Sequence, residues 1–260
     1  MEVLEFDTYN ILFTLGVSFA IQIGFFSLAA YFKTDKVTDL SYGLTFVIIA
    51  WILFLLGDTR TTPQLVLSLM VTAWGIRLAG YLFIRILKIK KDKRFDGIRE
   101  NFWKFASFWT LQGTSIWLIL IPTTVFLSSS STENFEILNL VGLKIWAIGL
   151  IAETIADWQK FQFKNNPANK GKWIQSGLWA HSRHPNYFGE LLCWWGIFVY
   201  VLPILNYFLF LSLIGPLTIT TLILFISGIP TIEKKYDERY KDNPEYQKYK
   251  ESTHVIIPFL

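Results

Sequence analysis

Long apolar runs constrain the fold of this chain more than any other feature of its sequence. Hydrophobic residues make up 52% of the 260, and several runs approach or exceed the ~20 residues that a helix needs to cross a ~30 Å hydrocarbon layer. The predicted spans are residues 9–32, 42–56, 64–87, 105–127, 140–161, 187–202 and 207–229. The sequence therefore predicts an all-α, polytopic integral membrane protein with one domain, 1–260.

Lysine and arginine are distributed unevenly among the loops between these spans. Basic residues gather in 33–41, 88–104, 162–186 and the tail 230–260, whereas the alternate loops carry only Arg60 or none. Because cytoplasmic loops hold the excess of Lys and Arg, we predict an N-terminus outside the membrane and a C-terminus in the cytoplasm. One span more or fewer would put the basic loops out of phase.

The first residues do not resemble a cleavable signal peptide. Glu2, Glu5 and Asp7 are acidic where a signal peptide begins with a basic region. We therefore expect the first span to remain as a membrane helix. Cys193 is the sole cysteine, so an intrachain disulfide is excluded.

Charged residues inside the predicted spans are costly unless they are paired or wet. Helical spacing places Arg77, Tyr81 and Arg85 on one face of the third span. In the fifth span, Glu153 and Asp157 lie one turn apart. We expect these carboxylates to face the arginines and line a polar cavity open to the cytoplasm, with a structural ion-pair network as the alternative.

The segment 173–190, WIQSGLWAHSRHPNYFGE, holds the densest group of candidate site residues. Pro185 suits the first turn of a helix. The residues that cluster at this positive helix end, where a phosphate would bind, are Arg183, His184, Asn186 and Tyr187. Glu190 shares the face of Asn186. No further ligand accompanies the histidines at a familiar spacing, so no metal site is expected; an interfacial Trp-rich anchor and binding of anionic lipid headgroups are alternatives.

Five stretches carry a resemblance to a known family. They are SGLWAHSRHPNYFGE, RLAGYLFIRI, ETIADWQKFQFK, EKKYDERY and YQKYKESTHVIIPF. They resemble a bacterial membrane family of unknown function (DUF1295) related to steroid 5α-reductases and sterol C14 reductases, and more distantly to isoprenylcysteine carboxyl methyltransferases. The similarity runs from about Asp39 to the Ile-Pro-Phe near the end.

This resemblance implies a reductase with NADPH in the cytoplasmic half, about residues 150–260, and a lipid-like enone in a membrane cavity. Residues implied at the nicotinamide end are Asp157, Asn186, Glu190 and Tyr236. Residues implied at the phosphates or adenosine are Arg77, Lys164, Arg183 and His184, with Tyr187 in the same cluster. A basic set that converges on a multiply charged anion is also what electrostatics favours.

The implied chemistry is hydride transfer from the nicotinamide to a conjugated C=C bond. The substrate would enter from the bilayer of a bacterial inner membrane and the nucleotide from the cytoplasm; no nucleic-acid partner is expected. The chain departs from the reductases at Trp74, where they have Tyr, and it lacks their Gln-Glu pair. Tyr81 or Asp39 could supply the proton instead, with packing and helix capping as their structural alternatives.

Two other functions remain open. The S-adenosylmethionine-dependent methyltransferases share the Arg-His-Pro-x-Tyr core and a similar tail, although Asn186, Glu190 and the basic loop favour the reductases and a 2′-phosphate. A non-catalytic lipid-binding or transport protein would use the charges inside the membrane as a substrate path.

Overall fold

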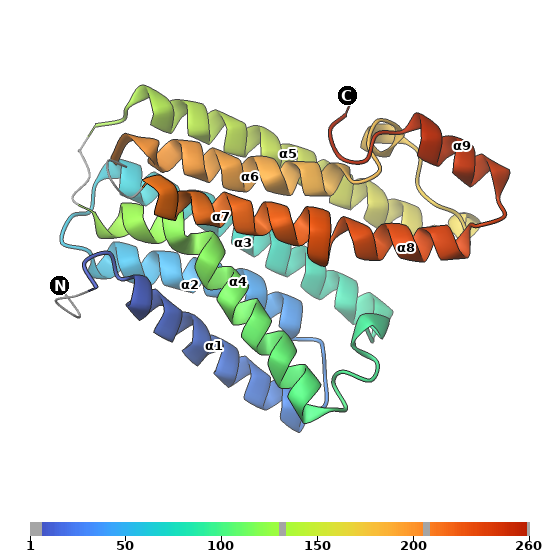
Figure 1. Ribbon diagram of the computed structural model, residues 1–260, viewed down its shortest axis with the longest axis horizontal. Coiled ribbons are helices and arrows are strands. Elements are labelled where there is room, and N and C mark those ends of the chain that lie inside the picture. Colours follow the sequence, from blue (N-terminus) through green and yellow to red (C-terminus); the bar gives the residue numbers. More distant parts are fainter. Residues whose placement is uncertain (1–6, 130–133, 205–208, 259–260) are drawn as a thin grey trace. The chain divides into compact units, whose positions relative to one another are not determined.

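The protein is an all-α, polytopic integral membrane protein (Figure 1). The computed structural model describes residues 7–129, 134–204 and 209–258. Within them, seven helical stretches are long and apolar enough to cross a membrane. The first six are α1 (Ile11–Tyr31), α2 (Thr38–Leu56), α3 (Thr62–Ile89), α4 (Phe102–Ser128), α5 (Ile137–Asn165) and α6 (Pro185–Val201). The predicted fold class is confirmed, and Glu2, Glu5 and the start of the predicted span 207–229 lie outside the described residues.

The seventh stretch is interrupted and runs further than hydropathy predicts. α7 (Leu209–Thr221) continues into one π-helical turn, Leu222–Ile226, and then into α8 (Ile229–Arg239). Gly228 lies between the π-helical turn and α8, where the helix bends. A Cβ at this position would lie 2.5 Å from the carbonyl oxygen of Ile223, so the bend requires glycine. The predicted end at residue 229 therefore marks a bend, beyond which a polar helix continues.

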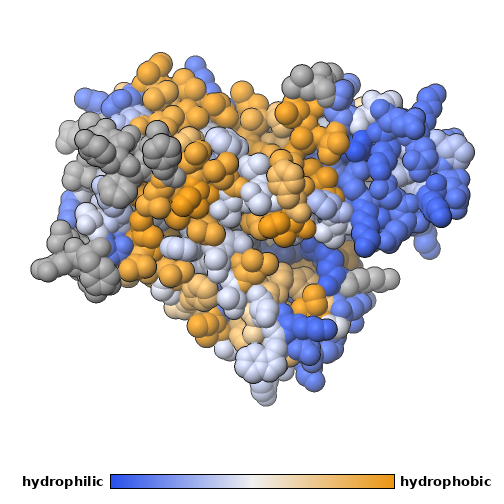
Figure 2. Space-filling view, viewed as in Figure 1, coloured by the Kyte–Doolittle hydropathy of each residue, from blue (hydrophilic) through white to orange (hydrophobic). Residues whose placement is uncertain are grey.

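The polar tail contains a further helix, α9 (Pro244–Ser252). The side chain of Asn243 caps its first turn by accepting from the backbone N–H of Glu245 at 3.0 Å and of Tyr246 at 3.2 Å. Figure 2 shows hydrophilic residues gathered over α9 and the end of α8.

The described chain divides into two compact units. The first comprises Met1–Val141 with Ile197–Gly215, and the second comprises Gly142–Gly196 with Pro216–Leu260. The chain passes between them within α5, α6 and α7. The prediction of one domain remains a prediction.

In the first unit, α2 and α3 approach closely at glycine. A Cβ on Gly43 would lie 2.7 Å from the carbonyl oxygen of Gly75. A buried hydrogen-bond network joins α1, α2 and α4: the amide nitrogen of Gln22 donates to Thr45 at 2.8 Å, and that of Gln112 donates to Gln22 at 2.8 Å. Such polar contacts hold helices together where lipid supplies no hydrophobic drive.

One end of the first unit is held by ion pairs. Arg85 pairs with Asp39 at 3.1 Å and lies 3.6 Å from Asp92, so these two carboxylate partners belong to the first unit. Asp39 does not cap α2, because Val37 occupies the cap position. Beside them, Arg99 and Asp35 form a buried pair.

In the second unit, α5 and α6 run antiparallel with their backbones in contact. A Cβ on Gly149 would lie 2.7 Å from the carbonyl oxygen of Gly189, and one on Gly189 would lie 2.5 Å from the backbone nitrogen of Glu153. α6 begins at Pro185, as predicted. The motif 173–190 thus leads directly into a helix packed tightly on α5.

Candidate functional site

The segment before α6 is fixed to α5 by hydrogen bonds. The backbone N–H of Leu178 donates to the side-chain oxygen of Gln159 at 3.0 Å, and the indole of Trp179 donates to the carbonyl of Ala156 at 3.1 Å. Gly177 has φ +63°, a backbone conformation that favours glycine. It packs against the side chain of Gln159. The short helical turn Gly177–Ala180 is therefore held at the polar end of α5.

The motif is also joined to the chain's C-terminal tail. Ser182 and His254 form a parallel bridge, and the backbone N–H of Arg183 donates to the carbonyl of His254 at 2.8 Å. One guanidinium nitrogen of Arg183, Nη1, donates to the carbonyls of Lys250 at 2.6 Å and Thr253 at 2.7 Å. Arg183 thereby closes the tail over the start of α6.

Glu233 on α8 is the centre of this arrangement. Its carboxylate accepts two hydrogen bonds from Arg183, at 3.1 Å from Nε and 3.2 Å from Nη2. Nε2 of His184 lies 2.8 Å from Oε1 of the same carboxylate. The bidentate geometry is the strong form of an arginine–carboxylate pair, so these contacts connect the motif to α8 as well as to the tail.

His184 is 1% exposed, and its ring stacks on Tyr187 with centroids 5.7 Å apart. Burial lowers the pKa of its imidazole, against the raising effect of the Glu233 carboxylate. A neutral ring that donates from Nε2 to Glu233 keeps Nδ1 as an acceptor. Nδ1 is buried and has no hydrogen-bond partner among the described residues.

An aromatic cluster borders the Arg183–Glu233 pair. We use this name for Trp173, Tyr236, Tyr240, Tyr246 and Tyr249. Ring centroids of Trp173 lie 5.1 Å from those of Tyr240 and 5.2 Å from those of Tyr246. With Arg183, His184 and Glu233, four of these rings line a cavity of about 20 Å³, which has room for one water-sized molecule.

The structure brings some of the predicted site residues together. Arg183, His184 and Tyr236 line one cavity, and Tyr187 stacks against His184. Those that share the second unit with them are Asp157 on α5, Lys164 in the last turn of α5, and Asn186 and Glu190 on α6. Those in the first unit are Asp39, Arg77 and Tyr81.

Trp74 also lies in the first unit. It is fully buried, and its ring meets Phe46 edge-on with centroids 5.1 Å apart. Trp74, which stands where the reductases have Tyr, is therefore a packed residue of the buried core.

Sequence reasoning missed Glu233. The signal was present, because no Asp, Glu, Lys or Arg occurs between Glu190 and Glu233. Glu233 is therefore the first charge after the last apolar run, in a stretch where only Tyr236 was singled out. The partnership with Arg183 could not be predicted, since 50 residues separate the two.

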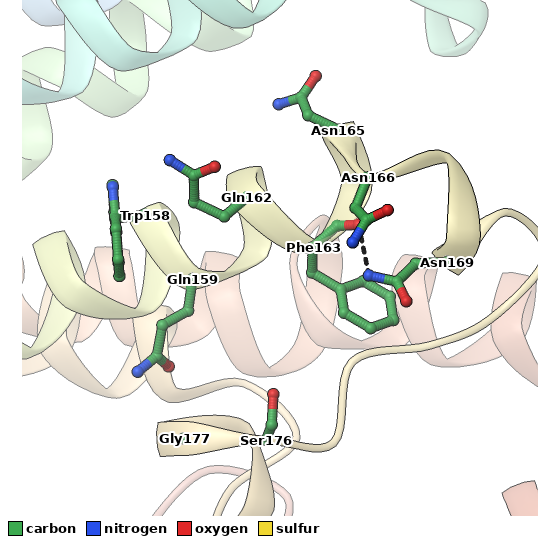
Figure 3. A pocket seen from close by; sticks show the side chains of 9 residues that line it. All are labelled: Trp158, Gln159, Gln162, Phe163, Asn165, Asn166, Asn169, Ser176 and Gly177. Atoms are coloured by element: carbon green, nitrogen blue, oxygen red, sulfur yellow. Dashed lines mark hydrogen bonds between the residues drawn. The ribbon is translucent and has the colours of Figure 1, made fainter.

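A second cavity lies at the polar end of α5 (Figure 3). It measures about 480 Å³ and is lined by α5, the turn Pro167–Asn169 and the segment at Ser176 and Gly177. Its lining consists of amides, two aromatic rings, a hydroxyl and a glycine: Trp158, Gln159, Gln162, Phe163, Asn165, Asn166, Asn169, Ser176 and Gly177. We call it the amide groove.

Comparison with known proteins gives a family and a named relative. Residues 25–253 match the family described as a protein of unknown function, DUF1295. A probable O-methyltransferase, ustE of Ustilaginoidea virens, is 46% identical over 124 residues. That match covers 42% of this chain and 44% of the relative, so the chain spans less than half of that protein's length. No solved structure matches.

The relative overturns the predicted function. The prediction of an NADPH-dependent reductase is wrong, because the named relative is a probable methyl-transferring enzyme, the class that sequence reasoning ranked second. Both classes share the Arg-His-Pro-x-Tyr core, and the reductases were favoured only because of Asn186, Glu190 and the basic loop. The family itself is as the motifs indicated: this chain belongs to the DUF1295 family of proteins of unknown function.

Proposed function

We propose that this protein is a membrane-embedded, S-adenosylmethionine-dependent O-methyltransferase. The observation that carries the proposal is the 46% identity over 124 residues to a probable O-methyltransferase. The cluster around Glu233 supports it, because the cluster combines a carboxylate, aromatic faces and a buried histidine acceptor in one place.

The residues of this cluster fit such a cofactor in their chemistry. When bound, S-adenosylmethionine supplies an electrophilic methyl group on a sulfonium, and cations are attracted by aromatic faces and carboxylates. Buried polar atoms without a partner among the described residues are available for its other groups: His184 Nδ1, Asn186 Oδ1, Trp173 Nε1 and Tyr240 OH. Since the cavity is about 20 Å³, its walls must move apart to admit the cofactor.

We assign His184 the role of base. Glu233 accepts from Nε2 and so fixes the ring with Nδ1 as the acceptor. Nδ1 would take the proton of an acceptor hydroxyl, so that the oxygen of this hydroxyl could receive the methyl group that S-adenosylmethionine would supply. Positioned bases of this kind contribute about 10²- to 10⁴-fold to a rate.

We further propose that the acceptor is lipid-like and that the site faces the cytoplasm. The basic loops 88–104 and 162–186 and the basic tail support this orientation by the positive-inside rule. A lipid acceptor accounts for an enzyme built from membrane helices, because such a substrate can enter from the bilayer.

The test is methyl transfer by the purified protein in detergent. With S-adenosylmethionine labelled in its methyl group and total bacterial lipid as acceptor, we expect label in the lipid phase. The variant His184→Gln should lose label about 10²-fold or more. No transfer by the wild-type protein to any lipid fraction would contradict the proposal.

A further inference from the structure

The amide groove belongs to no function assigned so far. Four of its amides use one atom to support the local fold, and the other atom makes no hydrogen bond to the part of the chain that the structure describes. Gln159 accepts from Leu178, and Asn166 accepts from the N–H of Ala168 at 3.0 Å. The amide nitrogens of Asn165 and Asn169 donate to carbonyls of α5 at 2.7 and 3.1 Å, the second drawn in Figure 3.

These bonds determine what the groove offers to a ligand. Gln159 and Asn166 keep an N–H₂ donor, while Asn165 and Asn169 keep a carbonyl acceptor. Gln162 makes no side-chain hydrogen bond to any described residue and offers both. The groove therefore presents donors and acceptors in mixture, which suits a ligand whose hydroxyls can both donate and accept. Among residues 7–129, 134–204 and 209–258, no charged side chain lines the groove, so it does not suit a phosphate as its main ligand.

An apolar face of α5 leads to the groove. Ile148, Ile151, Ile155 and Trp158 are 61%, 59%, 41% and 60% exposed, and they recur three or four residues apart. That spacing places them on one face of the helix, and Gln162 follows on the same face. Figure 3 shows Trp158 and Gln162 side by side on α5. Trp is typical of the boundary between hydrocarbon and water, which favours a position of the groove at the level of the lipid headgroups.

We infer that the amide groove binds the uncharged, hydroxyl-bearing headgroup of a lipid whose chain lies along the exposed face of α5. The size fits, since 480 Å³ lies within the range of small-molecule sites. The adjoining turn connects the groove to the cluster around Glu233, because Gly177 lines the groove and Trp179 lines the cavity beside Glu233. That this lipid is the methyl acceptor rests on the proposed function; that it binds does not.

The experiment measures lipid retention by native mass spectrometry of the protein in detergent. Three lipids with the same acyl chains serve as probes: monogalactosyl diacylglycerol, phosphatidylglycerol and diacylglycerol. The wild-type protein should retain the galactolipid in preference to the other two. Gln162→Leu should reduce that retention about tenfold, the value of one or two hydrogen bonds.

The matched control is Ser107→Ala. Ser107 is an exposed residue of α4 that donates to the carbonyl of Trp103 and lies outside both the groove and α5, so retention should not change. Ile151→Ala should weaken the retention of all three lipids alike, because it removes a contact to the acyl chain at a residue outside the groove. Equal retention of galactolipid and phosphatidylglycerol, or no effect of Gln162→Leu, would overturn the inference.

Titration of S-adenosylhomocysteine into the same proteins separates this inference from the proposed function. Gln162→Leu should leave that affinity unchanged. If the variant loses nucleoside affinity instead of galactolipid, the groove is part of the cofactor site and the inference fails. If the wild type binds no S-adenosylhomocysteine but retains galactolipid, the proposed function is contradicted and the inference that the groove binds a lipid headgroup is supported.

Discussion

Within the described chain, Arg183 makes five hydrogen bonds, counting the one from its backbone, and they connect the start of α6 to α8 and to the C-terminal tail. Its side chain is 12% exposed and that of Glu233 is 16%. Removal of one partner from such a buried pair costs about 3–5 kcal/mol, because the other charge is left uncompensated. We therefore expect Arg183→Ala to destabilise the second unit by about 3 kcal/mol, as measured by thermal unfolding in detergent.

The control is a double-mutant cycle with Glu233→Ala. If the two residues act as a pair, the double variant should lose much less than the sum of the single losses. Arg183→Lys should also be destabilising, because lysine cannot reproduce the bidentate contact. Additive losses would show that Arg183 and Glu233 contribute independently.

Because His184 is the proposed base, we predict that the rate of methyl transfer depends on pH. Burial, with Lys160 and Arg183, lowers its pKa below 6.5, while Glu233 acts in the opposite direction. A lowered pKa keeps the imidazole neutral and able to accept a proton as pH falls to about 6.5. We expect the rate to stay level down to that value and to fall only below it. The stability that depends on neutral His184 is present above about 6.5 and is lost as pH falls further.

A variant identifies the group responsible. His184→Gln should remove the acidic fall from the pH–rate profile along with most of the rate. A profile of unchanged shape in this variant would assign the titration to another group, and His184 would not be the base.

At the scale of single residues, the sequence identifies candidate site residues near the motif but does not identify the residues that they contact. Arg183 and His184 stand out because charge and imidazole are rare beside apolar spans. What their side chains do depends on Glu233 and on backbone carbonyls of the tail, 49 to 70 residues away. The prediction that Arg183 binds phosphate stays a prediction; in the structure its guanidinium donates to oxygens of the protein itself.

Among the helices, the close contact between α5 and α6 requires glycine at positions 149 and 189. Gly149→Ala would place a methyl 2.7 Å from both Gly189 O and the backbone nitrogen of Cys193. Because backbone atoms cannot move aside easily, we expect a loss of about 1–3 kcal/mol and weaker methyl transfer. Gly16→Ala on α1 is the matched control, since nothing lies within 4 Å of its added Cβ. Thermal unfolding of the two variants should differ, and similar midpoints would contradict the tight contact.

Helix boundaries were predictable where the chain carries a local signal. Pro185 starts α6 because proline tolerates the first helical position, and the predicted start was two residues off at most. α8 and α9 were not predicted, because a hydropathy search detects only apolar helices and these two are rich in Glu, Lys and Tyr. They supply Glu233 and most of the aromatic cluster, so much of the candidate site escaped a search based on membrane spans.

For the whole molecule, length and hydropathy sufficed for seven helical membrane spans, since the thickness of hydrocarbon imposes that length on any helix. Function could not be predicted in the same way. The Arg-His-Pro-x-Tyr motif forms a helix start with a paired arginine and histidine, and by resemblance this motif is common to the reductases and the methyltransferases. The choice of NADPH depended on counting loop cations, of which Lys164 is exposed and Arg183 is engaged within the protein.

The measurement that tests the central claim most directly is calorimetric titration of the purified wild-type protein with S-adenosylhomocysteine, in parallel with NADP⁺. The proposed function predicts saturable binding of S-adenosylhomocysteine that is weakened at least about tenfold in Tyr236→Ala, which removes one aromatic face from the cavity. Saturable binding of NADP⁺ with none of S-adenosylhomocysteine would contradict it.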